Sequence, residues 1–408
     1  MRGSTEPCRV HRVRTGADRL EADPTLYERL PDRRFALLAH PASVTWRLEH
    51  ISSVLDRLQR RPRIIFGPEH GYGGEAQDMI GVADAKDVYG TPVRSLYGDA
   101  FDDLSPRDAD LDGCELVLVD LQDVGSRYYT FVWTAVLVMR AAAKKGIPVL
   151  VLDRPNPTGH TRAEGRSLDP EFRSFVGLEP VPVRHALTLG EICALRAEEE
   201  GLALDALRIA PVLDLHAEAL ATAWDRPFVM TSPNMPTADT ALVYPGGCLL
   251  EGTNLSDGRG TTRPFEITGA PWLDGERLAR GLAETGLPGF VARPLTFSPT
   301  FHKHARETCG GVQIHVTSPG EFLPYATYLA LVALAHHAHP EAFRFRTERY
   351  EFVDTIPAFD LLTGSAEARE RIVRGDAPRD IALALSALGP GDPEKLAQAR
   401  DAARRRAV

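Results

Sequence analysis

The sequence is poor in cysteine, has no long apolar run and carries no excess of positive charge. Its five cysteines lie far apart among 408 residues and form no CxxC pair. This spacing excludes a zinc ribbon and a thioredoxin-type motif and predicts reduced, buried thiols. No apolar run approaches the ~18 residues of a membrane-spanning helix. The net charge of −9 disfavours nucleic acid and anionic membranes as partners, because both attract positively charged proteins.

The signatures of several enzyme classes are also absent. The sequence contains no HExxH, GxSxG or GxxxxGK[ST] motif, and no GxGxxG opens a helix after a strand. Zinc-protease, P-loop and dinucleotide sites are therefore not predicted. The histidines His302, His304 and His315 lack a nearby carboxylate or cysteine at a familiar metal-ligand spacing. We predict neither a metal nor another cofactor.

The N-terminal segment is basic but lacks the apolar core of a secretory signal peptide. We therefore predict a cytoplasmic location, or an extracellular or periplasmic one if an export signal was removed from the chain. The sequence makes no prediction of the oligomeric state.

What the sequence does contain is the composition of a folded protein of about two domains. Hydrophobic residues make up 43% and charged residues 25% of the chain, which is ordinary for a globular protein. In the first half, apolar runs alternate with helix-like segments, and this alternation predicts βαβ units around a parallel sheet. The expected strands are 35–39, 64–66, 116–119 and 147–152, and the expected helices are 129–145 and 46–60, the latter with Leu48 on its apolar face.

The second half is less regular and predicts a smaller α/β domain. We expect strands at 242–250, 312–316 and 351–356, helices at 323–337 and 366–374, and an exposed helix at 393–408. A packed connection around 228–240 separates an N-terminal domain, residues 1–235, from a C-terminal domain, residues 236–408. The predicted fold class is α/β, with a parallel sheet in the larger domain.

Polar residues cluster directly after the expected strands. They are His40, Glu69, His70, Asp120, Gln122, Asp123, Asp153, Arg154 and Asn156. The carboxyl edge of a parallel sheet is where open α/β folds bind ligands, so this pattern predicts a ligand site. The alternative is that Asp and Asn stand there as turn formers and helix caps.

Three segments carry the candidate chemistry. In GPEHGYGG, glycines and a proline hold Glu69 at a strand end, where partial burial would suit a general acid; the alternative is a loop cap or a partner of arginine. In LQDVGSRYYT, a carboxylate, Arg127 and two tyrosines suit a polyhydroxylated ligand; the alternative is that Tyr128 and Tyr129 begin a helix and one of them packs into the core. In residues 244–272, polar groups stand between glycines, which indicates a ligand surface or a solvated loop.

Seven segments of the sequence together resemble the DUF1343 family, which is associated with exo-acting β-N-acetylmuramidases of the NamZ type. They are FGPEHGYGG (66–74), TPVRSLYG (91–98), LQDVGSRYYT (121–130), LDRPNPTG (152–159), SFVGLEPVPVRHALTLGE (174–191), SPNMPT (232–237) and YPGGCLLEGTNLSDGRGTTRPFEITGAPW (244–272). The resemblance implies a Rossmann-like N-terminal domain, a smaller C-terminal domain and a site in the cleft between them. It also implies release of N-acetylmuramic acid from non-reducing ends of peptidoglycan fragments, with Glu69 as the catalytic residue.

For that reaction we expect Glu69 to be the general acid and a second carboxylate to act at the anomeric carbon. The candidates are Asp123, Asp120 and Glu266, at a distance from Glu69 of about 5–5.5 Å in a retaining enzyme and about 6.5–9.5 Å in an inverting one. The acetamido group of the substrate is an alternative to this carboxylate. Arg127, Arg154 or Arg259 would bind the lactyl carboxylate, since arginine binds carboxylates in a bidentate manner.

The full set of expected substrate-binding residues follows from these segments. It consists of His70, Asp120, Gln122, Arg127, Tyr128, Tyr129, Arg154, Asn156, His185, Asn234, Glu251, Asn254 and Arg259. The expected partners are peptidoglycan-derived muropeptides or glycan fragments. Two other hypotheses stay open: a muropeptide-binding protein without catalysis, and a hydrolase of another bond, such as an amide or ester, that uses the same cleft.

Overall fold

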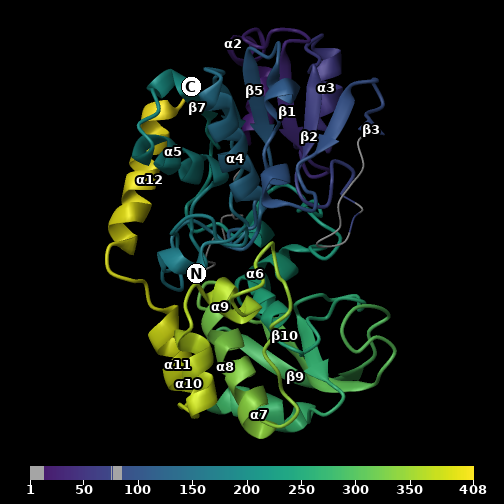
Figure 1. Cartoon of the computed structure of the whole chain (residues 1–408), viewed down its shortest axis with the longest axis vertical. Helices are drawn as coiled ribbons and strands as arrows, with labels where there is room; N and C mark the ends of the chain where they lie inside the picture. The colour runs from purple at the N-terminus through teal and green to yellow at the C-terminus, as the bar shows by residue number, and fades with distance from the viewer. Residues whose placement is uncertain (1–12, 75, 77–84) are drawn as a thin grey trace, which may run out of the picture.

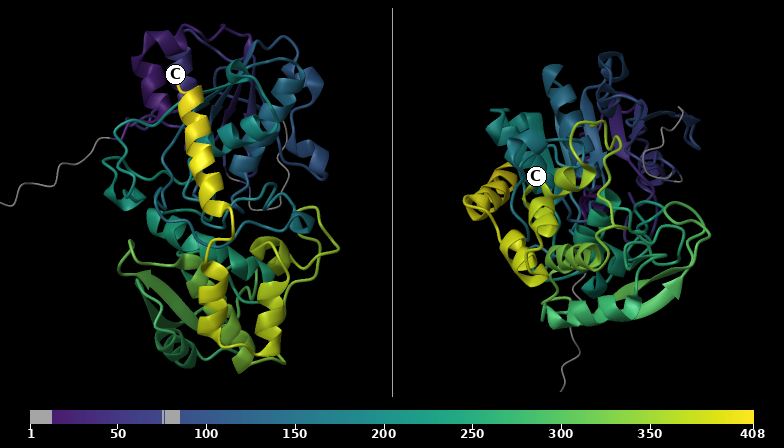
Figure 2. Two further views of the ribbon diagram at one scale, coloured as in Figure 1. Left: turned by 90° about the vertical axis from the view of Figure 1, so that its left-hand side faces the viewer. Right: turned by 60° about the horizontal axis from the view of Figure 1, so that its bottom comes forward.

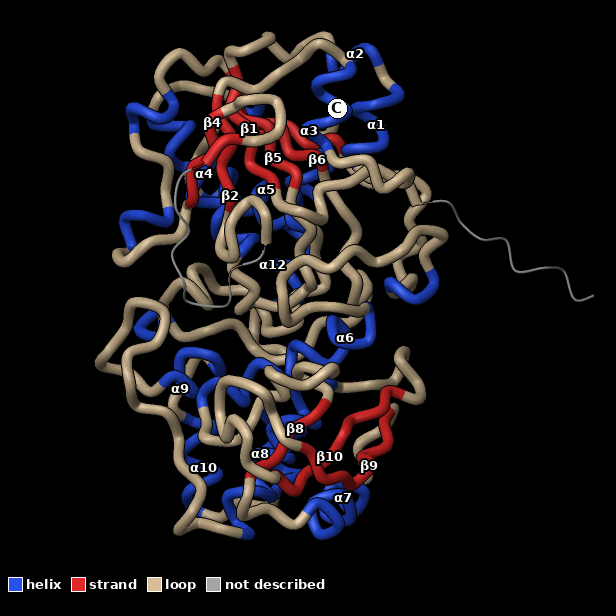
Figure 3. The backbone as a smooth tube through the Cα atoms, turned by 90° about the vertical axis from the view of Figure 1, so that its right-hand side faces the viewer, coloured by secondary structure: helices blue, strands red, loops and turns tan. Residues whose placement is uncertain are grey.

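The computed structural model describes residues 13–74, 76 and 85–408. Its two sheets lie in separate parts of the molecule, one above the other in Figure 1, and Figure 3 shows loops filling the region between them. We call the residues up to the end of the larger sheet the N-terminal part and the residues from α6 (Ala238–Gly247) to α11 (Pro378–Ser386) the C-terminal part.

The N-terminal part is built on a seven-stranded sheet of order β3-β4-β2-β1-β5-β6-β7. The strands are β1 (Phe35–Ala39), β2 (Ile64–Gly67), β3 (Ala85–Lys86), β4 (Pro92–Ser95), β5 (Leu116–Asp120), β6 (Val149–Leu152) and β7 (Leu207–Ala210). All neighbours pair in parallel except β3 with β4. Without its edge strand β3, this is the Rossmann strand order, whose direction reverses between β1 and β5. The predicted α/β class and parallel sheet are confirmed.

Helices cover both faces of this sheet. They are α1 (Gly16–Ala22), α2 (Pro24–Tyr27), α3 (Ile51–Arg57), α4 (Phe131–Lys144) and α5 (Leu189–Glu199), with short 3₁₀ turns η1 (Phe101–Leu104), η2 (Asp108–Leu111), η3 (Pro170–Phe172), η4 (Leu204–Ala206) and η5 (Ala221–Ala223). The helix expected at 46–60 is wrong at its start. His50 is the N-cap residue of α3, and its ring accepts a hydrogen bond from the backbone N–H of Ser52, so the helix begins at Ile51. Leu48 lies before the helix with φ 60° and is 54% exposed.

The C-terminal part packs helices against a three-stranded antiparallel sheet of order β8-β10-β9. Its elements are α6, η6 (Cys248–Gly252), β8 (Ile267–Ala270), α7 (Gly275–Glu284), β9 (Phe290–Phe297), β10 (Cys309–Val316), α8 (Pro324–Ala338), α9 (Ala358–Thr363), α10 (Glu367–Arg374) and α11.

Two expected strands in this part are wrong. The apolar run at 242–250 lies in α6 and η6, and every residue of this run is buried. A helix that is apolar all round shows no amphipathic period, so its sequence resembles that of a buried strand. Residues 351–356 form a turn rather than a strand.

The last helix, α12 (Asp392–Arg406), runs back along the N-terminal part and packs against α5 (Figure 2). Leu396, Ala399 and Ala402 are buried, so the expectation of a fully exposed helix is wrong. The chain ends beside the large sheet, where the backbone N–H of Val408 donates to the carbonyl of Ile209 at 2.9 Å. The division into residues 1–235 and 236–408 stays a prediction.

The remaining sequence expectations concern cysteines and membrane helices. The four cysteines that the structure describes, Cys114, Cys193, Cys248 and Cys309, are free and buried, as predicted, and Cys8 lies outside the described residues. In the described ranges, no helix is both long enough and apolar enough to cross a membrane.

A buried glutamate joins the two parts and makes stability depend on pH. Glu164 accepts a hydrogen bond from the backbone N–H of Ala326 in α8 at 2.8 Å. Burial raises the pKa of its carboxyl from 4.5 to about 7. The folded protein therefore binds a proton that the unfolded chain has released, so the stabilising contribution is complete below pH 4.5 and is lost as the pH rises to about 7.

We expect Glu164→Gln to remove this pH dependence. The quantity to compare is the denaturant midpoint of the variant minus that of the wild type. This difference should be more positive at about pH 8 than at about pH 5, because the neutral amide carries no penalty for ionisation. Unfolding curves at both pH values measure the difference, with the exposed Glu171→Gln as the control. An equal midpoint difference between variant and wild type at both pH values would contradict the role of Glu164 ionisation in stability.

Candidate active site

A pocket lies where the two parts meet. The N-terminal part lines it with Glu69, His70, Tyr128, Tyr129, Thr130 and Val176, and the connecting segment adds Ser232, Asn234 and Met235. The C-terminal part contributes Tyr244, Glu251, Arg259, Phe265, Tyr350 and Glu351. The volume open to the centre of a water molecule is ≈ 40 Å³, which leaves room for water beside these carboxylates.

Glu69 enters the pocket from the end of β2. The backbone turns sharply there, with φ 68° at His70 and φ 80° at Gly71. A Cβ on Gly67 would lie 2.4 Å from the backbone nitrogen of Tyr72, so the turn requires glycine. The hydroxyl of Thr130 donates to Oε2 of Glu69 at 2.7 Å. The side chain is 6% exposed, so a buried carboxyl is held in one orientation at the pocket wall.

Tyr128 and Tyr129 form the adjacent wall. The Tyr128 hydroxyl donates to the carbonyl of Pro245 at 2.6 Å, and the Tyr129 hydroxyl donates to Thr231 Oγ1 at 2.7 Å. Both rings lie edge-on to Tyr244, at centroid distances of 6.3 and 5.7 Å. Burial raises the pKa of both phenols. Both tyrosines therefore pack into the core and also line the pocket, but they precede α4 rather than begin it. Their role in ligand binding stays a prediction.

The C-terminal part contributes a chain of charged groups to the pocket lining. Arg259 donates through Nη2 to Glu251 Oε1 and through Nη1 to Asp257 Oδ2, each at 2.9 Å. Tyr350 donates to the second oxygen of Glu251 at 2.5 Å. Although burial opposes ionisation, the charges of Lys303 and Arg259 hold the pKa of Asp257 well below its usual range. The guanidinium of Arg259 is therefore fixed at the pocket by two carboxylates.

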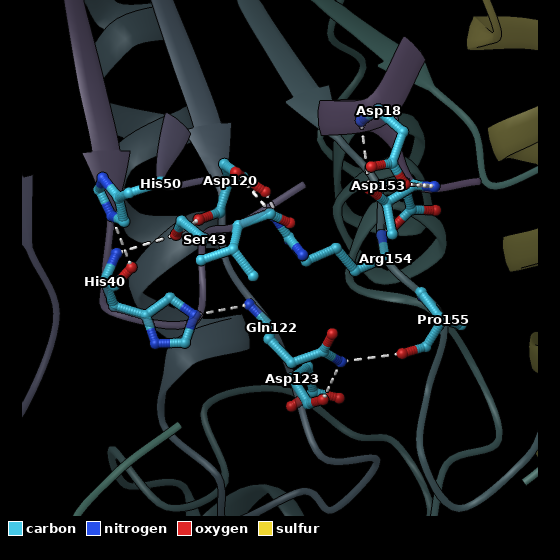
Figure 4. A network of polar contacts seen from close by, with 12 residues as sticks. Asp18, His40, Ser43, His50, Asp120, Gln122, Asp123, Asp153, Arg154 and Pro155 are labelled. Atoms are coloured by element: carbon cyan, nitrogen blue, oxygen red, sulfur yellow. Dashed lines mark hydrogen bonds and ion pairs between the residues drawn. The ribbon is translucent and has the colours of Figure 1, made fainter. Parts of the chain in front are cut away.

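The polar residues after the other strands form a network of hydrogen bonds and ion pairs (Figure 4). Arg154 donates to both carboxylate oxygens of Asp120, at 2.6 and 2.9 Å, and both side chains are buried. The backbone N–H of Gln122 donates to Nε2 of His40 at 2.9 Å. Burial and the charge of Arg154 hold the pKa of His40 well below its usual value, so its ring is the neutral acceptor that this bond needs.

Asp123 belongs to the same interior layer. Its Oδ2 accepts from the backbone N–H of Gly125 at 2.8 Å and lies 3.2 Å from Nε2 of His185. The amide of Gln122 donates to the carbonyls of Asp123 and Pro155, and Asn156 accepts from Thr158. These contacts hold together the loops that follow β5 and β6.

Arg127, Asn254 and Glu266 also hold the structure together. Arg127 is fully buried and donates to the carbonyls of Arg166, Val181 and Leu362, which joins the two parts. Asn254 binds the backbone of Ala342 and Arg344. Glu266 accepts from Thr240 at 2.9 Å, and burial raises its pKa.

The pocket thus brings together only some of the predicted residues. Those that line it are Glu69, His70, Tyr128, Tyr129, Asn234, Glu251 and Arg259. Those that do not, all in the described part of the chain, are Asp120, Gln122, Asp123, Arg127, Arg154, Asn156, His185, Asn254 and Glu266. Thr130 belongs to the LQDVGSRYYT segment, which the sequence analysis proposed for ligand binding. Ser232, Tyr350 and Glu351 were not predicted as site residues, and nothing in the pattern around Tyr350 and Glu351 indicated a site.

Within residues 13–74, 76 and 85–408, no group of three or more His, Cys, Asp or Glu side chains is arranged to hold a metal ion. The polar groups that the described lining residues of the pocket offer are carboxylates, phenols, hydroxyls, the imidazole of His70, the amide of Asn234 and the guanidinium of Arg259. This set suits proton transfer and the binding of a polyhydroxylated, anionic ligand.

Comparisons with known proteins identify the family. The N-terminal and C-terminal family models of exo-β-N-acetylmuramidase NamZ match residues 35–239 and 242–387. The peptidoglycan β-N-acetylmuramidase NamZ of Bacillus subtilis (strain 168) is 39% identical over 376 residues, which cover 91% of this chain and 86% of that protein.

Solved structures agree with this assignment. A DUF1343 family protein from Bacteroides fragilis NCTC 9343 superimposes with a TM-score of 0.83 and 25% identity, over 98% of this chain and 99% of that one. A second DUF1343 protein from the same strain has a TM-score of 0.70 and 25% identity, over 96% and 98% of the two chains. The chain belongs to the NamZ family of exo-β-N-acetylmuramidases, a family of glycosidases.

Proposed function

We propose that this protein removes N-acetylmuramic acid from the non-reducing end of peptidoglycan-derived glycan fragments, with Glu69 as the general acid. The observation that carries the proposal is the placement of Glu69: a buried carboxyl, oriented by Thr130, in a pocket that also holds a guanidinium. Family membership supports the substrate class.

In this reaction Glu69 gives its proton to the glycosidic oxygen as the bond to the anomeric carbon breaks. The hydroxyl of Thr130 donates to Oε2 of Glu69 at 2.7 Å and so fixes the orientation of the carboxyl. In the proposed reaction, the other carboxyl oxygen faces the glycosidic oxygen. Proton transfer to the leaving oxygen is needed because an alkoxide is a poor leaving group. The rings of Tyr128 and Tyr129 at the same wall would contact the apolar face of the sugar.

We assign recognition of the lactyl carboxylate to Arg259. Of the three arginines predicted for this role, all of which the structure describes, Arg259 alone lines the pocket. Asp257 and Glu251 hold its guanidinium, and it stacks over the Phe265 ring at 4.9 Å from the centroid. A planar guanidinium fixed in this way matches the geometry of a carboxylate.

The test compares the 4-nitrophenyl glycosides of β-N-acetylmuramic acid and β-N-acetylglucosamine. We expect release of nitrophenol from the muramic acid glycoside and unchanged activity in the presence of a chelator. Arg259→Lys should lower the ratio of activity on the muramic acid glycoside to activity on the glucosamine glycoside. Arg263→Lys, at a half-exposed neighbouring position, should leave this ratio unchanged. Tight binding of a muramic acid disaccharide without turnover would instead favour a binding protein, and loss of activity with chelator would favour a metal-dependent hydrolase of another bond.

A further inference from the structure

We propose that Glu351 is the second carboxylate of the hydrolysis, an inference that rests on the proposed function. It lines the same pocket as Glu69 but comes from the C-terminal part, far away in the sequence. Its side chain is 6% exposed, so its carboxylate is enclosed in the pocket wall. Most glycosidases use a pair of carboxylates that flank the scissile bond, and these two residues supply one from each part of the chain.

Glu351 is presented by a tight turn in an unusual conformation. The backbone groups of Tyr350 and Val353 exchange two hydrogen bonds, of 2.8 and 2.9 Å. The two residues inside this turn have positive φ angles, 45° at Glu351 and 70° at Phe352. Residues with a Cβ rarely adopt this conformation, because the side chain then crowds the backbone. Such strain persists where surrounding contacts enforce it, and it concentrates at functional sites.

The surrounding contacts come from the N-terminal part. The ring of Phe352 packs against Tyr97, Phe101 and Phe175 at centroid distances of 5.7, 6.2 and 6.3 Å. This aromatic cluster holds the turn across the junction of the two parts. It therefore fixes the position of the carboxylate that precedes Phe352.

A hydrogen bond orients the carboxylate itself. The hydroxyl of Tyr97, which follows β4, donates to Oε2 of Glu351 at 3.2 Å. Tyr97 also belongs to the aromatic cluster that holds Phe352. One residue of the N-terminal part thus fixes both the backbone turn and the orientation of its acidic side chain.

The other candidate carboxylates that the structure describes fit the role less well. Both oxygens of Glu251 are bound, one to Arg259 and one to Tyr350. Asp123, Asp120 and Glu266 do not line the pocket, although the structure describes all three. Among the residues that the structure describes, Glu351 is the pocket-lining carboxylate besides Glu69 and Glu251, and we assign it the role opposite Glu69.

The step assigned to Glu351 supplies the electron pair that replaces the glycosidic bond. The bond between the anomeric carbon and the leaving oxygen breaks, and that oxygen takes the proton of Glu69. The new bond at the anomeric carbon forms either to a water oxygen, whose proton passes to Glu351, or to a Glu351 oxygen, which water then displaces. Both routes consume one water molecule. The anomer first released distinguishes them, inverted in the first case and retained in the second.

Chemical rescue tests the assignment. On the 4-nitrophenyl muramic acid glycoside, we expect Glu351→Ala to lower kcat by about 10²-fold or more, in the range of general acid–base effects. Sodium azide should restore turnover and give the α-configured muramyl azide, because azide enters the space left by the carboxylate and needs no base. Glu351→Gln, which keeps the side-chain shape, should be equally slow. The exposed Glu348→Ala in the same segment is the matched control.

The outcomes separate this proposal from the function on which it rests. Glu351→Ala that is slow but yields no azide adduct would show a structural role and overturn the assignment. So would a variant within a few-fold of the wild type. A wild-type protein that cleaves no muramic acid substrate would instead overturn the function, and the role of Glu351 with it.

Discussion

Replacement of Glu69 by glutamine should slow cleavage of a muramic acid disaccharide by about 10²–10⁴-fold in kcat, the usual contribution of a general acid. Glutamine has nearly the shape of glutamate and can keep the hydrogen bond from Thr130, but it has no proton to give to the leaving sugar oxygen. Substrate binding should change little, because the pocket wall stays intact. Steady-state kinetics that separate kcat from KM measure both quantities.

The leaving group provides the sharper test. 4-Nitrophenolate departs without much protonation, so Glu69→Gln should retain far more activity on the nitrophenyl glycoside than on the disaccharide. Thr130→Val, which removes the hydrogen bond to Glu69 but keeps the carboxyl, should cause a smaller loss of the same kind. The exposed Glu276→Gln on α7 serves as the control. Equal losses on the two substrates would contradict a role in proton transfer.

Breaking the buried ion pair between Asp120 and Arg154 should destabilise the protein by about 3–5 kcal/mol, the cost of leaving one charge buried without its partner. Both side chains are almost fully buried, and Arg154 binds both carboxylate oxygens. In Arg154→Met the carboxylate of Asp120 loses both of these hydrogen bonds. The shift of the denaturant unfolding midpoint measures the loss.

An exposed pair gives the matched comparison. Arg404 and Asp401 lie 2.7 Å apart on α12, with side chains 76% and 57% exposed, so Arg404→Met should change stability by less than about 1 kcal/mol. Arg154→Met protein that remains folded should retain its preference for muramic acid over glucosamine, since Arg154 does not line the pocket. If Arg154→Met had the unfolding midpoint of the wild type but lost the preference for muramic acid over glucosamine, Arg154 would have to be a substrate-binding residue.

The elements that sequence reasoning located correctly share a local signal. The runs at 35–39 and 116–119 are apolar throughout because helices cover both faces of their sheet, and such runs mark buried parallel strands directly. The elements located wrongly lack a local signal of their own. At 242–250 an apolar run fits a buried strand or a buried helix equally well, and packing against α8 decides for the helix.

Some features of the candidate site follow from the sequence, and others follow only from the tertiary structure. The sequence by itself determined the family, the parallel sheet and the prominence of Glu69, because the turn after β2 depends on adjacent glycines and a proline. Spacing alone does not tell which charges meet, so it grouped Asp120 and Arg154 with the ligand residues although they neutralise each other in the interior. Tertiary structure alone brought Glu351 to the pocket, because its position depends on a strained turn held by aromatic rings from the other part of the chain.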